Sequence, residues 1–134
     1  MNVLLDSCIL IDHFNSISAA TDYLRRAETS ARVSAITRAE VLTGLVGTAR
    51  QSAVRFLDCF AFLPIDRDVA DLAAELRRVH HWKLPDAIQA AVAQHHGLHL
   101  ATRNTSDFNP KRHAFVVVPY TLPVRAGYHT APQT

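Results

Sequence analysis

Residues 2–14, NVLLDSCILIDHF, contain the pattern that decides the fold of this chain. A short apolar run from Asn2 to Leu5 stops at Asp6, as in a buried strand whose carboxyl end reaches the edge of a core. The following residues, Ser7 to Phe14, place apolar side chains at helical spacing. The stretch therefore predicts a buried strand that turns directly into a helix, with a carboxylate at the junction.

The same alternation of short strands and longer helices continues outward from this stretch. Further strands are predicted over 32–35, 61–65, 99–102 and 114–118, and further helices over 18–28, 37–45, 49–60, 66–80 and 85–96. Pro64 interrupts the 61–65 strand, which we expect to be short or at a sheet edge. Strands that alternate with helices indicate an α/β domain with a mainly parallel sheet.

The composition fits one compact domain. The chain has 134 residues, of which 49% are hydrophobic and 19% charged, so it can form a core and is not expected to be disordered. We expect a single domain over 1–134, with a loose tail from about residue 120, where prolines accumulate. The net charge of +2 excludes a strongly basic coat for nucleic acid.

The sequence also bears on the compartment. No apolar run approaches the roughly 20 residues that cross a bilayer, so we expect no contact with a membrane. The N-terminus lacks the pattern of a signal peptide, and we expect a cytoplasmic protein. Cys8 and Cys59 both lie among apolar residues and are interpreted as buried, reduced thiols.

Four carboxylates stand where predicted strands end and helices or loops begin. They are Asp6, Glu40, Asp86 and Asp107. Because an α/β fold gathers the carboxyl ends of its strands on one rim, we expect these side chains to cluster there. Clustered anions repel one another unless a cation neutralises them, and sites rich in oxygen suit Mg²⁺ or Mn²⁺. Such ions activate water in phosphoryl chemistry, so the pattern predicts a Mg²⁺- or Mn²⁺-dependent phosphodiester hydrolase.

Each of these acids also has a purely structural explanation, and the sequence alone leaves it open. Asp6 is a good N-cap residue for the helix that follows it. Glu40 is the last residue of a capping-box pattern that begins at Thr37. Asp86 would be stabilised by the helix dipole, and Asp107 is of a type common in turns.

Histidines and basic residues are the other side chains in the sequence that could bind a metal or a phosphate. The eight histidines show no zinc-type spacing, and His13 is interpreted as a residue of a helix surface. Three cations that flank the fourth acid are predicted to contact phosphate groups: Arg103, Lys111 and Arg112. Phe108 beside them is expected in the core.

Four stretches of the chain resemble the signatures of PIN domains. They are LLDSCILID (4–12), ITRAEVLTGL (36–45), LPDAIQAAVA (84–93), and LATRNTSDF (100–108) followed by FVVVP (115–119). More narrowly, they resemble the small VapC-type ribonuclease toxins of bacterial and archaeal toxin–antitoxin systems. The resemblance covers nearly the whole chain with the motifs in the right order.

The resemblance implies a fold and a set of site residues. The fold is a three-layer α/β/α domain with a five-stranded parallel sheet in the order 3-2-1-4-5. The family's metal-binding acids correspond to Asp6, Glu40, Asp86 and Asp107. Its supporting polar positions correspond to Ser7, Thr102 and Asn104, which would orient carboxylates, a metal-bound water or the phosphate.

The resemblance also implies a reaction and partners. The reaction is Mg²⁺- or Mn²⁺-dependent endonucleolytic cleavage of RNA, with Arg103, Lys111 and Arg112 as candidate contacts to the RNA backbone. The partner is a VapB-like antitoxin, and the toxin is expected as a homodimer or in a toxin–antitoxin hetero-oligomer. The alternatives are a PIN-like DNA nuclease and a catalytically inert PIN module that binds nucleic acid or protein.

Overall fold

The computed structural model describes residues 1–123 and contains one five-stranded sheet. The strands are β1 (Val3–Leu5), β2 (Ala31–Ser34), β3 (Ala61–Leu63), β4 (His99–Ala101) and β5 (Val116–Val117). They lie in the order β3-β2-β1-β4-β5, and every neighbouring pair is parallel. The predicted fold class and strand order are therefore confirmed.

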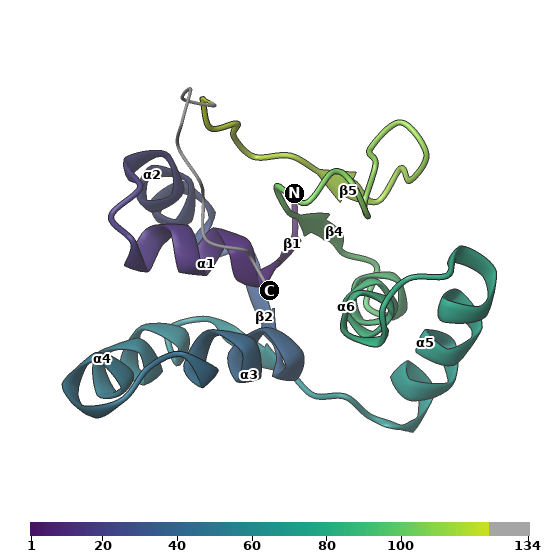
Figure 1. The fold of residues 1–134 in the computed structure, drawn as a ribbon, viewed down its shortest axis with the longest axis horizontal. Coiled ribbons are helices and arrows are strands. Elements are labelled where there is room, and N and C mark those ends of the chain that lie inside the picture. The colour runs from purple at the N-terminus through teal and green to yellow at the C-terminus, as the bar shows by residue number, and fades with distance from the viewer. Residues whose placement is uncertain (124–134) are drawn as a thin grey trace.

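Six helices cover the two faces of this sheet (Figure 1). They are α1 (Ser7–Phe14), α2 (Ser18–Ala27), α3 (Ala35–Thr43), α4 (Gly47–Leu57), α5 (Arg67–His80) and α6 (Leu84–His95). Within β1, Val3 and Leu5 point into a core shared with α1 to α4, whereas Leu4 points into a core shared with α5 and α6. This alternation follows from the period of two along a strand and produces the three layers.

Helix α3 begins earlier than the sequence pattern predicts. Its N-cap is Ser34, whose Oγ accepts a hydrogen bond from the backbone N–H of Thr37 at 3.2 Å. Thr37 therefore lies inside the helix, and the proposed capping box between Thr37 and Glu40 is wrong. Glu40 lies in the second turn, beyond the unpaired backbone N–H groups of the first turn that a capping residue would bind.

Three further expectations need correction. The last strand is only Val116–Val117. The residues before it form a turn, in which the Val116 N–H donates a hydrogen bond to the His113 carbonyl oxygen. Cys59 is exposed, although Cys8 is buried and both thiols are free as expected. His13 is half-buried rather than on a helix surface: its ring stacks on Phe56 with centroids 4.5 Å apart.

The edge position of β3 and the core position of Phe108 are confirmed. Of the expected tail, residues 124–134 lie outside the described part, whereas Tyr120 hydrogen-bonds to Asp12 in α1. Among residues 1–123, no helix combines the length and the apolar character needed to cross a membrane.

Candidate active site

All four predicted acids line one cavity of about 300 Å³. We call it the acid cleft and define it by Asp6, Glu40, Asp86 and Asp107. Each acid comes from a different place in the fold: the end of β1, the second turn of α3, the first turn of α6 and the loop after β4. The parallel sheet thus brings together residues that lie far apart in the sequence; Asp6 and Asp107, the most distant pair, are 101 positions apart.

Asp6 is the most buried of the four, at 8% exposure, and its carboxylate is held from several sides. Oδ2 accepts a hydrogen bond from Thr102 Oγ1 at 2.6 Å, and Oδ1 accepts bonds from the Ser7 backbone N–H at 3.0 Å and Gln89 Nε2 at 3.3 Å. Burial raises the pKa of Asp6, and these hydrogen bonds act in the opposite direction. Asp6 is the N-cap of α1 as well, so the two sequence interpretations of this residue are compatible.

Gln89 was not predicted, and it is the buried residue that joins Asp6 to the neighbouring elements. Its Oε1 accepts a bond from Ser34 Oγ at 2.6 Å. Its Nε2 also lies 2.6 Å from Thr37 Oγ1 and 3.3 Å from the Leu5 carbonyl oxygen. The only sequence signal was a polar residue inside the otherwise apolar stretch AIQAAVA.

Every side-chain polar atom that is buried in residues 1–123 has a hydrogen-bond partner. The polar layer under the acid cleft is therefore satisfied, and it fixes the carboxylate of Asp6 in one orientation. Leucine at position 89 would leave the hydroxyls of Ser34 and Thr37 without this partner.

The four carboxylates repel one another, and Asp86 shows this most clearly. Its pKa rises from the ordinary 3.8 to about 7, first because of burial and then because of the charges of Asp107 and Asp6. A hydrogen bond between the carboxyls of Asp86 and Asp107 contributes to the same rise. Burial and the charge of Asp6 also raise the pKa of Glu40, against a hydrogen bond from Ser7. In the metal-free cleft, Asp86 therefore binds its proton more tightly than an isolated carboxyl does.

All three predicted supporting residues contact the acids directly: Ser7 bonds to Asp6 and Glu40, and Thr102 and Asn104 bond to Asp6 and Asp107. Thr102 bonds to Asp6 as described, and Asn104 Nδ2 donates to Asp107 Oδ2 at 3.0 Å. The backbone N–H of Asn104 in turn donates to Thr102 Oγ1 at 2.9 Å, which links both residues in one turn. Ser7 lines the cleft beside Asp6.

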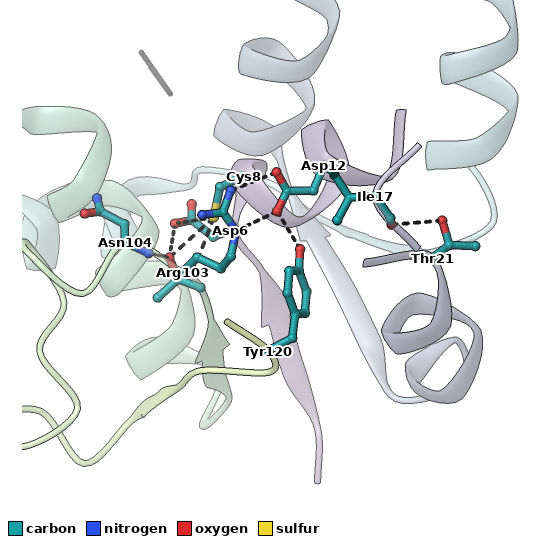
Figure 2. A network of polar contacts seen from close by, with 9 residues as sticks. Asp6, Cys8, Asp12, Ile17, Thr21, Arg103, Asn104 and Tyr120 are labelled. Carbon is teal, nitrogen blue, oxygen red and sulfur yellow. Dashed lines mark hydrogen bonds and ion pairs between the residues drawn. The ribbon is translucent and has the colours of Figure 1, made fainter. Parts of the chain in front are cut away.

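Arg103 also lines the cleft, but its guanidinium group is engaged with Asp12 (Figure 2). Nε and Nη2 donate to the two carboxylate oxygens of Asp12 at 2.6 and 2.8 Å, a bidentate pair. Tyr120 Oη donates to the same carboxylate at 2.7 Å. Asp12 and Tyr120 were not predicted; the signal was a second acid one helical turn and a half after Asp6, in DSCILID.

The other two predicted cations lie outside the acid cleft. Lys111 and Arg112 are both exposed in the loop before β5. Arg112 lines a neighbouring cavity instead. The structure thus brings Arg103 together with the acids and does not bring Lys111 or Arg112 into the same cavity.

The acid cleft fits a hydrated divalent cation. Among residues 1–123, no three His, Cys, Asp or Glu side chains converge into a preformed metal site. However, Mg²⁺ keeps several waters and binds directly through only one or two carboxylates, so it needs room between the acids rather than contact among them. Four oxygen donors that repel one another around a cavity of about 300 Å³ meet this requirement.

The raised pKa of Asp86 predicts how the stability of the metal-free protein depends on pH. A carboxyl whose folded pKa exceeds its unfolded value makes folding most favourable below about pH 4, and that stability is lost as pH rises to about 7. We expect Asp86→Asn to remove part of this loss. With solvent screening of this half-buried group, the gain is about 1 kcal/mol, or roughly 3 °C in Tm at pH 7.5.

Melting curves in EDTA at pH 4.5 and pH 7.5 measure this effect. The variant should melt above the wild type at the higher pH and close to it at the lower one. A variant that melts well below the wild type at both pH values would instead assign Asp86 to the stability of α6.

Comparisons with known proteins agree with this geometry. A family model described as the PIN domain matches residues 3–112. Ribonuclease VapC10 of Mycobacterium tuberculosis is 33% identical over 113 residues, which span 79% of this chain and 85% of the relative. The matched range of the family model includes all four acids of the cleft.

Solved structures share the fold at similar coverage. A toxin–antitoxin complex from Klebsiella pneumoniae contains a chain with a TM-score of 0.81 and 37% identity, matched over 90% of this chain and 100% of that one. FitAcB from Neisseria gonorrhoeae contains a chain with a TM-score of 0.71 and 27% identity, matched over 90% and 99%.

Proposed function

Because this chain belongs to the PIN-domain family, we propose that it is a VapC-type endoribonuclease that hydrolyses RNA phosphodiester bonds with Mg²⁺ or Mn²⁺. The observation that carries the proposal is the convergence of Asp6, Glu40, Asp86 and Asp107 on one cleft. The relationship to Ribonuclease VapC10 supports RNA as the substrate.

The four acids are the residues that would hold the cation. If a divalent ion were held there, its chemistry would be to polarise the phosphate and to activate water at neutral pH. Asp6 is kept in one orientation by Thr102 and Gln89, so its lone pairs are directed before any ligand binds. Burial and the neighbouring carboxylates raise the pKa of Asp86 to about 7, so binding of a cation would favour release of its proton.

Supporting residues orient the acids or contact the RNA. Thr102 and Asn104 orient Asp6 and Asp107 through the hydrogen bonds described above. Ser7 lines the cleft, and its hydroxyl would orient a water on the cation or bind the phosphate. Arg103, which lines the cleft and is held by Asp12, would contact the RNA backbone, and exposed Lys111 would contact it farther out.

The relatives suggest what this domain assembles with. Structures similar to it include a toxin–antitoxin complex from Klebsiella pneumoniae and FitAcB from Neisseria gonorrhoeae. We therefore expect the chain to assemble with a VapB-like antitoxin in a hetero-oligomer. We further propose that it forms one domain, acts in the cytoplasm and can also occur as a homodimer. Co-expression with the product of an adjacent small reading frame, followed by size-exclusion chromatography, tests this assembly.

RNA cleavage by the purified protein should require a divalent ion. Four clustered carboxylates cannot bind a phosphate unless a cation neutralises them. We expect cleavage of single-stranded RNA to disappear in EDTA and to return with Mg²⁺ or Mn²⁺, as measured by gel electrophoresis of a labelled substrate. A DNA strand of the same sequence is the control for substrate class, and undiminished cleavage in EDTA would exclude the metal mechanism.

A further inference from the structure

A second cavity adjoins the acid cleft and shares part of its wall. It has a volume of about 390 Å³, and Ser106 and Asp107 line both cavities. The rest of its wall includes His80, Trp82, Arg112 and His113. We call it the histidine cavity. Because the two cavities adjoin, an RNA strand bound in the acid cleft could continue directly into the histidine cavity.

The wall of the histidine cavity contains three packed rings. His80 stacks on Trp82 with centroids 4.3 Å apart and an interplanar angle of 25°. The ring of His113 lies 5.1 Å from each of them. Trp82 is buried at 6% exposure, whereas His80 is exposed and His113 half-buried, so the imidazoles reach the solvent side.

The backbone on both sides of this cavity is fixed by hydrogen bonds. Trp82 Nε1 donates to the Asp107 carbonyl oxygen at 2.9 Å, and the Trp82 carbonyl oxygen accepts from Arg77 Nη1 at 2.7 Å. On the other side, the Asn109 carbonyl oxygen accepts the backbone N–H groups of Arg112 at 3.0 Å and His113 at 2.9 Å. The fourth acid of the cleft is thereby tied to the wall of the second cavity.

The wall of the histidine cavity includes one arginine, Arg112, and one carboxylate, Asp107, which it shares with the acid cleft. Arg112 is exposed and, within residues 1–123, takes part in none of the ion pairs. Burial, His80 and Arg112 lower the pKa of His113, whose ring nitrogens can donate or accept a hydrogen bond. One free guanidinium beside imidazole donors is the arrangement that binds a phosphate group.

We infer that the histidine cavity binds the phosphate of a nucleotide next to the bond that is cleaved. Arg112 supplies the charge, and His80 and His113 supply hydrogen bonds. The assignment to RNA rests on the proposed function, but the binding of a phosphate group rests only on the chemistry of this wall. The cavity extends the RNA site from one phosphate to at least two.

Trp82 provides a direct probe of this cavity, because it is the only tryptophan in the chain. The full-length Asp6→Asn variant with Mg²⁺ should bind a single-stranded RNA octamer with a change in Trp82 fluorescence and with little cleavage. Arg112→Ala should raise the Kd about tenfold and lower the slope of log K against log salt by about 0.7, the value for one phosphate contact on a single strand. Arg112→Lys should restore most of the slope, and Arg26→Ala, an exposed arginine of α2, should change neither quantity.

The same titration with inorganic phosphate distinguishes a site for an RNA strand from a site for a free phosphate ion. We expect its Kd to exceed that of the octamer by at least a hundredfold. Equal binding of inorganic phosphate would overturn the assignment to an RNA strand, and an unchanged Kd and slope in Arg112→Ala would overturn the cavity as a binding site.

Steady-state cleavage with Mg²⁺ supplies the second readout. Arg112→Ala should raise KM about tenfold and change kcat less than threefold, because the residue binds a phosphate that does not react. If the wild type cleaves RNA and Arg112→Ala keeps the wild-type KM, the phosphate site in the histidine cavity is wrong and the proposed endoribonuclease function stands. If the wild type cleaves no RNA with either ion, the proposed function fails, and the fluorescence titration still tests the cavity.

Discussion

Replacing Asp6 by asparagine should lower the rate of RNA cleavage by about 10³-fold or more, because it removes the charge most deeply buried in the acid cleft. Asparagine has nearly the same shape and is an equally good N-cap residue. The bonds from Ser7 and Gln89 to Oδ1 can persist, and the hydroxyl of Thr102 can accept where it now donates. The charge is therefore lost while the fold is kept.

Single-turnover cleavage and melting curves test this expectation together. Asp22→Asn, which removes an exposed carboxylate of α2, is the matched control and should retain full activity. An Asp6→Asn variant that melts like the wild type and still cleaves RNA at a comparable rate would remove Asp6 from the catalytic set.

Replacing Glu40 by glutamine should also reduce cleavage by orders of magnitude, about 10²- to 10³-fold, with little change in Tm. The reason is structural: Ser34, not Thr37, caps α3, so Glu40 has no capping bond to lose. Its carboxylate lies in the cleft, where burial and the charge of Asp6 raise its pKa. Removal of this charge weakens the binding of a cation and relieves repulsion in the metal-free state.

Mg²⁺-dependent shifts in Tm separate the two roles of this position. The wild type should gain stability with added Mg²⁺, and Glu40→Gln should gain less. Glu28→Gln at the exposed end of α2 is the control and should respond like the wild type. Full activity in Glu40→Gln would show that the cleft functions with three acids.

The sequence was informative wherever function depends on the ends of strands. Asp6 follows an apolar run directly, and Asp107 follows the loop after another, so the rule for parallel sheets was enough to bring them to one rim. Their convergence with Glu40 and Asp86 agrees with that prediction. The strand order 3-2-1-4-5 came from family resemblance and is confirmed.

The sequence was uninformative wherever a role depends on partners distant along the chain. Gln89 and Asp12 look ordinary in sequence, because their partners Asp6 and Arg103 lie 83 and 91 residues away. The start of α3 was misplaced for a different reason: Ser34 and Thr37 are both acceptable cap residues, and only the end of β2 decides between them. The brevity of β5 likewise depends on the turn at His113 rather than on its apolar composition.

The hydrogen bonds of Gln89 also affect the register in which the strands of this sheet pair. Strands of two to four residues have few ladder bonds, so they specify poorly which residue of one strand faces which residue of the next. A slip of β2 by two residues along β1 keeps every side chain on its proper face but moves Ser34 about 7 Å away from Gln89. Each buried polar group stranded in this way costs about 1–3 kcal/mol. The polar layer beneath the cleft thus helps to set the register between β1 and β2. A variant without this layer would be expected to populate shifted strand pairings, in which the four acids no longer lie in one cleft.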